Sequence, residues 1–97
     1  MYCFIFNGGT WTIDYVLKAL AKIITRNDHF SKQDKYDNYD YMIGTHNDWW
    51  VNVHEDTRNF EVYHRYHVSD LDCQALQRSI CFLLGVSKDN GYNNEGI

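Results

Sequence analysis

Two short segments decide the fold of this chain: residues 49–54, WWVNVH, and residues 59–67, NFEVYHRYH. In both segments the side chains alternate in polarity, which is typical of a strand with one face on a core. The four residues between them, EDTR at 55–58, favour a direct antiparallel connection. The pattern therefore predicts a β-hairpin with two different faces.

One register satisfies both faces of this hairpin, and it has three diagnostic pairs: Val53–Phe60, Trp50–Tyr63 and Asp48–Arg65. An aromatic pair and an opposite-charge pair directly across a sheet both stabilise such a register. The predicted core face carries Trp49, Val51, Val53, Phe60, Val62, His64 and Tyr66. The predicted outer face carries Trp50, Asn52, His54, Glu61, Tyr63 and Arg65.

A third strand is predicted over residues 39–46, just before Asn47-Asp48. These two residues fit a tight two-residue turn, although a slightly longer turn is also compatible with the sequence. The two-residue turn places Tyr41 and Ile43 on the outer face, next to the aromatic pair of the hairpin. An exposed apolar cluster of this kind marks a site for a partner.

The remaining elements come from helical periodicity and from turn residues. Residues 2–6 form a short strand, which the glycines after Asn7 end. Residues 12–26 form a helix whose apolar face carries Ile13, Val16, Leu17, Leu20 and Ile24. A second helix begins after Ser69 and ends at Gly85, with an apolar stripe of Leu76, Ile80 and Leu83 flanked by Cys73 and Leu84. Residues 27–38 are expected to be a loop with one helical turn.

This order, strand–helix–three strands–helix, predicts an α+β fold: a two-layer sandwich with a three- to four-stranded antiparallel sheet and two helices on one face. The first strand pairs either at an edge or beside the last strand. Residues 1–86 are expected to be a single compact domain, and residues 87–97 a flexible polar C-terminal tail.

Charge and cysteine content narrow the functional classes. A net charge of −4 disfavours direct binding to nucleic acid or to an anionic membrane. The chain has no apolar run long enough for a transmembrane helix, and its N-terminal segment lacks the features of a signal peptide. Three cysteines cannot all pair, and Cys73 and Cys81 are too far apart along one helix to form a bridge. We therefore expect reduced thiols and a cytoplasmic protein.

Acidic residues are concentrated between residues 28 and 56, where seven carboxylates stand against two lysines. Asp34, Asp37 and Asp40 recur there at a spacing of three, without the central glycine of a calcium loop. Two interpretations stay open: a solvated acidic loop, or a loop that recognises basic groups.

Catalytic and metal-binding patterns are weak. The predicted sheet region carries four histidines: His46, His54, His64 and His67. His54 stands beside Glu55, and His46 can meet His67 across the sheet; either pair would suit acid–base chemistry. Lys and Arg, which would clamp a phosphate, are scarce near both pairs. No His-x-His on one face and no Cys-x-x-Cys is present, so we expect no catalytic residue, no metal and no cofactor.

These features favour a small acidic protein-binding inhibitor that blocks a basic, nucleic-acid-binding surface of a protein or nucleoprotein complex. In size, charge and lack of motif the chain is similar to phage-encoded anti-CRISPR proteins and to the immunity proteins of bacterial toxins. A His-dependent nuclease or hydrolase and a self-associating scaffold, for example a homodimer, are the alternatives. The expected partner-binding residues are Asp34, Asp37, Asp40, Tyr41, Ile43, Trp50 and Tyr63.

Overall fold

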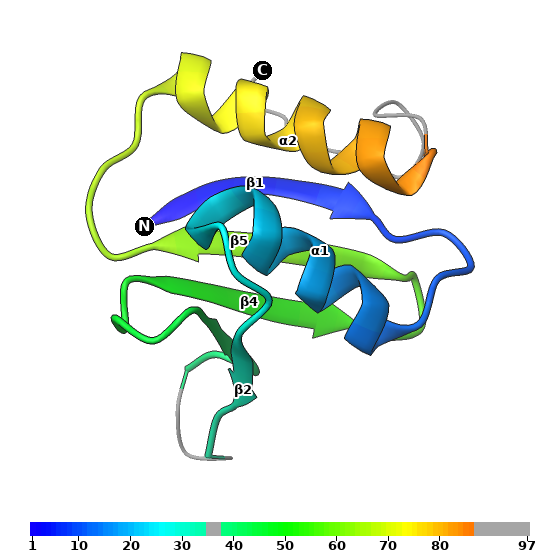
Figure 1. Cartoon of the computed structure of the whole chain (residues 1–97), viewed down its shortest axis with the longest axis horizontal. Helices are drawn as coiled ribbons and strands as arrows, with labels where there is room; N and C mark the ends of the chain where they lie inside the picture. The colour runs from blue at the N-terminus through cyan, green and yellow to red at the C-terminus, as the bar shows by residue number, and fades with distance from the viewer. Residues whose placement is uncertain (35–37, 87–97) are drawn as a thin grey trace.

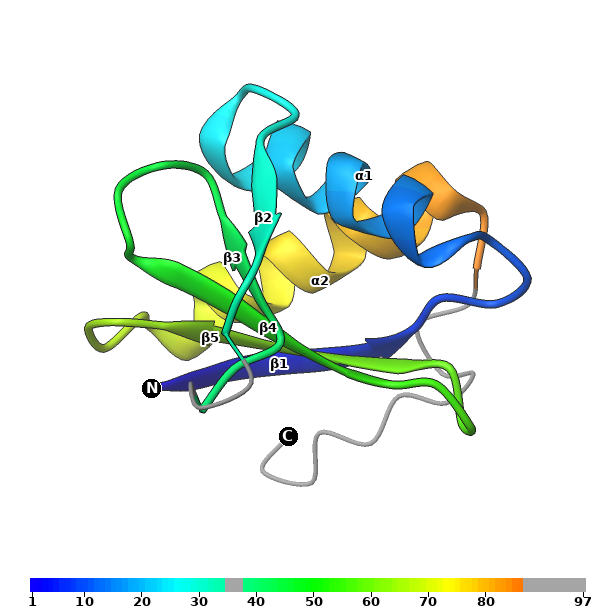
Figure 2. The ribbon, with the colours of Figure 1, turned by 90° about the horizontal axis from the view of Figure 1, so that it is seen from below.

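The computed structural model describes residues 1–34 and 38–86, so the expected C-terminal tail lies outside the described residues. The elements, in chain order, are β1 (Tyr2–Asn7), α1 (Ile13–Thr25), β2 (Phe30–Lys32), β3 (Tyr41–Ile43), β4 (Trp49–His54), β5 (Asn59–His64) and α2 (Asp70–Leu84). Both helices cover the same face of the sheet (Figures 1 and 2), which confirms the predicted two-layer α+β architecture.

The sheet has five strands, instead of the three or four predicted, in the order β1-β5-β4-β3-β2, and all neighbours are antiparallel. β1 is at the edge of the sheet and pairs with β5. It therefore occupies both of the predicted positions, an edge and a place beside the last strand. The prediction of a loop with a helical turn is wrong at residues 30–32, because β2 pairs with β3 through Phe30 and Ile43. Three residues are too few to show periodicity, so only the pairing reveals this strand.

The predicted hairpin register is confirmed. Val53 lies opposite Phe60 and Trp50 opposite Tyr63. The backbone N–H of Arg65 donates to the carbonyl of Asp48 at 2.8 Å, which extends the same register beyond the strands.

The core face of the hairpin is also largely as predicted. Val51, Phe60 and Val62 are fully buried beneath the helices. β5 ends at His64, however, so Tyr66, predicted to lie on the core face, is 61% exposed.

The outer-face placement of Tyr41 and Ile43 is wrong. Tyr41 pairs with Val51 and Ile43 with Trp49, so both lie on the helix-covered face, and Ile43 is only 1% exposed. The connection between β3 and β4 spans residues 44–48 instead of two residues. It shifts the register by an odd number of residues, and such a shift exchanges the two faces of a strand.

The helix termini follow the sequence signals. The side chains of Thr12 and Ser69 accept from the backbone N–H groups of Tyr15 and Asp72, as N-caps do. Gly85 ends α2 in the left-handed region, with a φ of 70°.

The buried face of α2 differs from the predicted stripe. Its buried residues are Cys73, Gln77, Ile80, Cys81 and Leu84. The Gln77 amide donates to the carbonyl oxygen of Ile5 at 2.9 Å, so a polar side chain occupies the centre of this face. The prediction that Leu83 lies on the core face is wrong: it is 50% exposed, because the helix is rotated to bring Gln77 onto β1.

The cysteine prediction is also wrong for two of the three residues. Cys3 on β1 and Cys73 on α2 form a disulfide, with their Cα atoms 5.5 Å apart. Cys81 is buried and is not part of this disulfide. Within the described ranges, no helix is long and apolar enough to cross a membrane.

The first prediction concerns the core. We expect Leu20→Ala to lower the free energy of unfolding by about 2–4 kcal/mol, because Leu20 is fully buried and its removal leaves a cavity. The same substitution at half-exposed Leu83 is the control and should cost less than about 1 kcal/mol. Urea denaturation measures both; equal losses would contradict the assignment of the α2 face.

The second prediction concerns the disulfide. Thiol titration of the unfolded, unreduced protein should find one reactive thiol, that of Cys81, and reduction should raise the number to three. Replacing Cys3 and Cys73 together by Ser should lower the free energy of unfolding by about 2–4 kcal/mol, because the unfolded chain loses a cross-link. The double variant should be insensitive to reductant. Three free thiols before reduction would refute the bond.

Candidate partner-binding site

Four aromatic rings form a cluster on the face of the sheet opposite the helices: Tyr2, Tyr39, Trp50 and Tyr63. Tyr39 stacks on Trp50, with ring centroids 5.1 Å apart and planes at 12°, and it also contacts Tyr63 at 5.1 Å. Tyr2 meets the edge of Tyr63 at 5.7 Å. The predicted Trp50–Tyr63 pair is thus joined through Tyr39, and we call these four rings the aromatic cluster.

Trp50 is held in place by its own hydrogen bond. Its indole N–H donates to Asn47 Oδ1 at 3.2 Å, in the turn between β3 and β4. Because this bond and the stack on Tyr39 both restrain the ring, the cluster offers an ordered apolar surface at low entropic cost to a partner.

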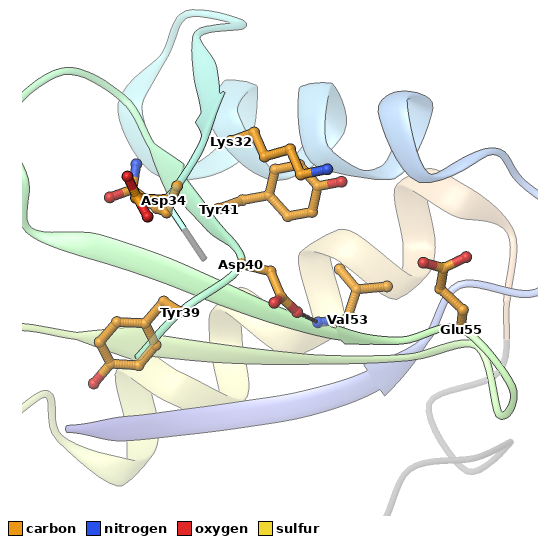
Figure 3. A pocket seen from close by; sticks show the side chains of 8 residues that line it. Lys32, Asp34, Tyr39, Asp40, Tyr41, Val53 and Glu55 are labelled. Atoms are coloured by element: carbon orange, nitrogen blue, oxygen red, sulfur yellow. Dashed lines mark hydrogen bonds between the residues drawn. The ribbon is translucent and has the colours of Figure 1, made fainter. Parts of the chain in front are cut away.

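Asp40 explains why Tyr39 reaches this face. Its backbone N–H donates to Asn52 Oδ1 at 2.9 Å, and its carboxylate accepts from the backbone N–H of Val53 at 2.8 Å. A side-chain oxygen thus replaces a backbone carbonyl where the β3–β4 ladder ends. The regular alternation is interrupted there, and Tyr39 and Tyr41 point away from each other (Figure 3). Strict alternation would have placed both tyrosines on one face.

Beside Asp40 lies a hollow of about 400 Å³, which we call the acidic hollow (Figure 3). Its lining residues are Lys32, Gln33, Asp34, Tyr39, Asp40, Tyr41, Val53 and Glu55. Three carboxylates therefore face one ammonium group. Burial, and then the charges of Asp14, Asp40 and Glu55, raise the pKa of the Tyr41 phenol. The same negative potential that holds this proton favours cationic groups from a partner.

A chain of hydrogen-bonding groups crosses the outer face of β4 and β5. Glu61 Oε1 accepts from the Tyr63 hydroxyl at 3.2 Å and lies 3.2 Å from His54 Nε2. Burial first, and then the charge and hydrogen bond of Glu61, raise the pKa of Tyr63 to about 12. Tyr63 therefore stays a neutral donor at physiological pH. Sequence proximity suggested Glu55 as the partner of His54, but the side-chain contact is with Glu61, which shares its face of the sheet.

The other histidines of the predicted sheet region have different neighbours. His46 lines a separate hollow of about 220 Å³ beside Asp48, and no hydrogen bond joins it to His67 in the described part of the chain. His64 packs against Trp49 at a ring distance of 4.3 Å. Across residues 1–34 and 38–86, no three His, Cys, Asp or Glu side chains are arranged to hold a metal ion.

The structure divides the predicted site residues into three groups. Asp34, Asp40 and Tyr41 line the acidic hollow. Trp50 and Tyr63 belong to the aromatic cluster. Ile43 is buried in the core and is not part of the site, and Asp37 lies outside the described residues.

Sequence reasoning missed several members of the site: Tyr2, Tyr39, His54, Glu55 and Glu61. Tyr39 is the most important of them, because it lines the acidic hollow and also stacks on Trp50. The outer-face positions of His54 and Glu61 follow from alternation, so their proximity could have been inferred from the register. The position of Tyr39 has no such signal.

The third prediction uses the pKa of Tyr63. The folded state raises it from an ordinary 10.0 to about 12, so the resulting stabilisation is complete below pH 10 and is lost as the pH rises to 12. Tyr63→Phe should therefore lose less stability than the wild type between pH 10 and 12. Urea midpoints across this range measure the effect, with Tyr66→Phe, at an exposed tyrosine, as the control. Identical pH profiles for wild type and Tyr63→Phe would contradict it.

Comparison with known proteins does not extend this description. The chain matches no protein-family model, no curated protein and no solved structure. Its function must therefore be argued from the acidic hollow and the aromatic cluster themselves.

Proposed function

We propose that this protein is a small acidic inhibitor that binds a partner protein and covers a basic, nucleic-acid-binding surface on it. The observation that carries the proposal is the junction at Tyr39, where the acidic hollow meets the aromatic cluster. Buried aromatic anchors supply most of the affinity of a typical interface, while charges around them set the rate and specificity of association.

The charge of the chain supports this class of partner. The net charge is −4, and among the described residues that line the acidic hollow three carboxylates stand against one lysine. A groove that holds nucleic acid carries many Lys and Arg side chains, so it attracts such a surface strongly at low salt. A phage-encoded anti-CRISPR protein would act in this way on a nucleoprotein complex.

The Cys3–Cys73 disulfide favours a second form of the same proposal. Disulfides persist mainly in oxidising compartments, so the bond weighs against the cytoplasmic location expected from the sequence. An immunity protein that meets a basic toxin outside the cytoplasm is consistent with the bond. Unfolding the protein from cells directly into excess alkylating agent distinguishes the two locations, because the thiols of a reduced pair are then modified and an oxidised pair is not.

A hydrolytic role is the competing proposal, and the His54–Glu61 pair is the observation behind it. His54 is well exposed, and a general base also needs groups that bind the substrate beside it. The carboxylates around this face would repel a phosphate. We therefore propose a binding role without catalysis.

The fourth prediction tests the charge requirement. The test variant combines three substitutions: Asp34→Asn, Asp40→Asn and Glu55→Gln. They remove three negative charges, and the Asn side chain at position 40 still has an oxygen that can accept from the backbone N–H of Val53. The association rate with the partner should fall at least about tenfold at low salt and become less salt-dependent.

The matched control removes three charges outside the acidic hollow: Asp28→Asn, Asp56→Asn and Asp70→Asn. Affinity capture from a host lysate at low and high salt identifies the partner, and surface plasmon resonance then gives the rates. The proposal gains support if one nucleic-acid-handling complex or basic toxin is captured by the wild type and by the control but poorly by the hollow variant. Equal rates for both variants would exclude the acidic hollow.

The fifth prediction concerns the aromatic cluster. Trp50→Ala should weaken binding by about 2 kcal/mol or more, as loss of a central aromatic anchor does, with a small effect on stability. Tyr66→Ala, at a residue outside the cluster, should leave binding unchanged.

Three measurements on the Trp50 variant separate the alternatives: melting temperature, oligomer mass and partner affinity. An unfolded variant would make the cluster structural. Release of monomers from a wild-type dimer would instead support self-association through this face. Intact folding with intact binding would remove Trp50 from the site.

A further inference from the structure

A second exposed apolar surface lies on the helix layer. Trp11 and Tyr15 stack with ring centroids 4.3 Å apart, and they are 39% and 46% exposed. Tyr15 and Leu83 line a hollow of about 180 Å³ together with Lys18, Ala19 and Lys22. We call this surface the helix-layer groove.

The groove is held in shape by contacts that do not need a ligand. The Trp11 indole N–H donates to the carbonyl of Leu84 at 2.7 Å, which ties the start of α1 to the end of α2. The Arg58 guanidinium donates to the carbonyls of Gly9 and Trp11. A groove that is already ordered binds a partner without first losing conformational entropy.

The exposure of Leu83 follows from the same rotation of α2 that buries Gln77. The Gln77 bond to Ile5 and the Cys3–Cys73 disulfide fix which face of α2 meets the sheet. Leu83 is consequently directed to the hollow beside α1. Its exposure results from the way the helix is attached and is not a frayed end.

The charge of the groove is opposite to that of the acidic hollow. Among the described residues that line the groove, the charged ones are Lys18 and Lys22, and neither forms an ion pair with another described residue. Tyr15, Lys18, Ala19 and Lys22 follow the i, i+3, i+4, i+7 spacing of one helix face. Within the described ranges, the lysines thus flank the exposed apolar side chains of Tyr15 and Leu83, with buried Ala19 beneath them.

We propose that the helix-layer groove docks an amphipathic helical segment of a partner protein, with apolar side chains on Leu83 and Tyr15 and with Asp or Glu against the two lysines. Apolar anchors at helical spacing flanked by complementary charge are the usual form of helix-in-groove recognition. Symmetric pairing of two copies would bring the lysines face to face, so the charge disfavours a second copy. The proposal does not depend on the proposed inhibitory function.

Two synthetic peptides test it. Both carry the same leucine stripe, one with Glu flanks and the other with Lys flanks, and each is titrated into the full-length protein by calorimetry. We expect the Glu peptide to bind at least about tenfold more tightly than the Lys peptide. Lys18→Glu with Lys22→Glu should reverse this preference.

Single variants separate the groove from other surfaces. Leu83→Ala should weaken the Glu peptide about tenfold or more, as loss of an apolar anchor does. Two control variants should leave the affinity for the Glu peptide unchanged. They are Leu71→Ala, at a 77% exposed leucine elsewhere on α2, and Trp50→Ala, in the aromatic cluster.

Three outcomes would overturn the proposal. The first is no binding of either peptide, and the second is equal affinity for both. The third is self-association of the protein that Leu83→Ala abolishes, because the groove would then belong to a second copy. If the Trp50→Ala variant still binds the Glu peptide but no longer binds the partner, the helix-layer groove is supported as a site that is separate from the aromatic cluster.

Discussion

The register between β4 and β5 is the constraint on which the rest of the structure depends. With Val53 opposite Phe60, the aliphatic side chains of both strands meet the helices, and Trp50 and Tyr63 are directed to the opposite face. A slip by one residue would exchange these faces and expose the core. The same register places Glu61 within reach of His54, so the packing of the core and the chemistry of the outer face share one cause.

The attachment of α2 to β1 is the second constraint, and it is polar and covalent instead of purely apolar. The Gln77 amide satisfies the carbonyl of Ile5 on an edge strand, whose polar groups would otherwise lack part of their pairing. The Cys3–Cys73 bond joins the same two elements. Together they set the rotation of the helix, and this rotation leaves Leu83 on the surface.

The molecule consequently has two hollows whose described lining residues carry opposite net charge. The acidic hollow, lined by residues of β2, β3 and β4 among others, meets the aromatic cluster at Tyr39. The helix-layer groove is flanked by Lys18 and Lys22. Opposite charges attract different groups, so the two surfaces suit the two different kinds of partner proposed above.

The sequence by itself determined the α+β class, the hairpin register and the apolar face of α1, because the spacing of side chains along one element encodes them. It also indicated Trp50, Tyr63, Asp34 and Asp40 as site residues. Only the tertiary structure decided the length of the β3–β4 connection, which buried Ile43, and the rotation of α2. The position of Tyr39 on the outer face likewise accompanies contacts between different segments, the Asp40 hydrogen bond to Val53 and the ring stack on Trp50. These outcomes depend on bonds between residues of different elements, and no periodicity within a single element records such bonds.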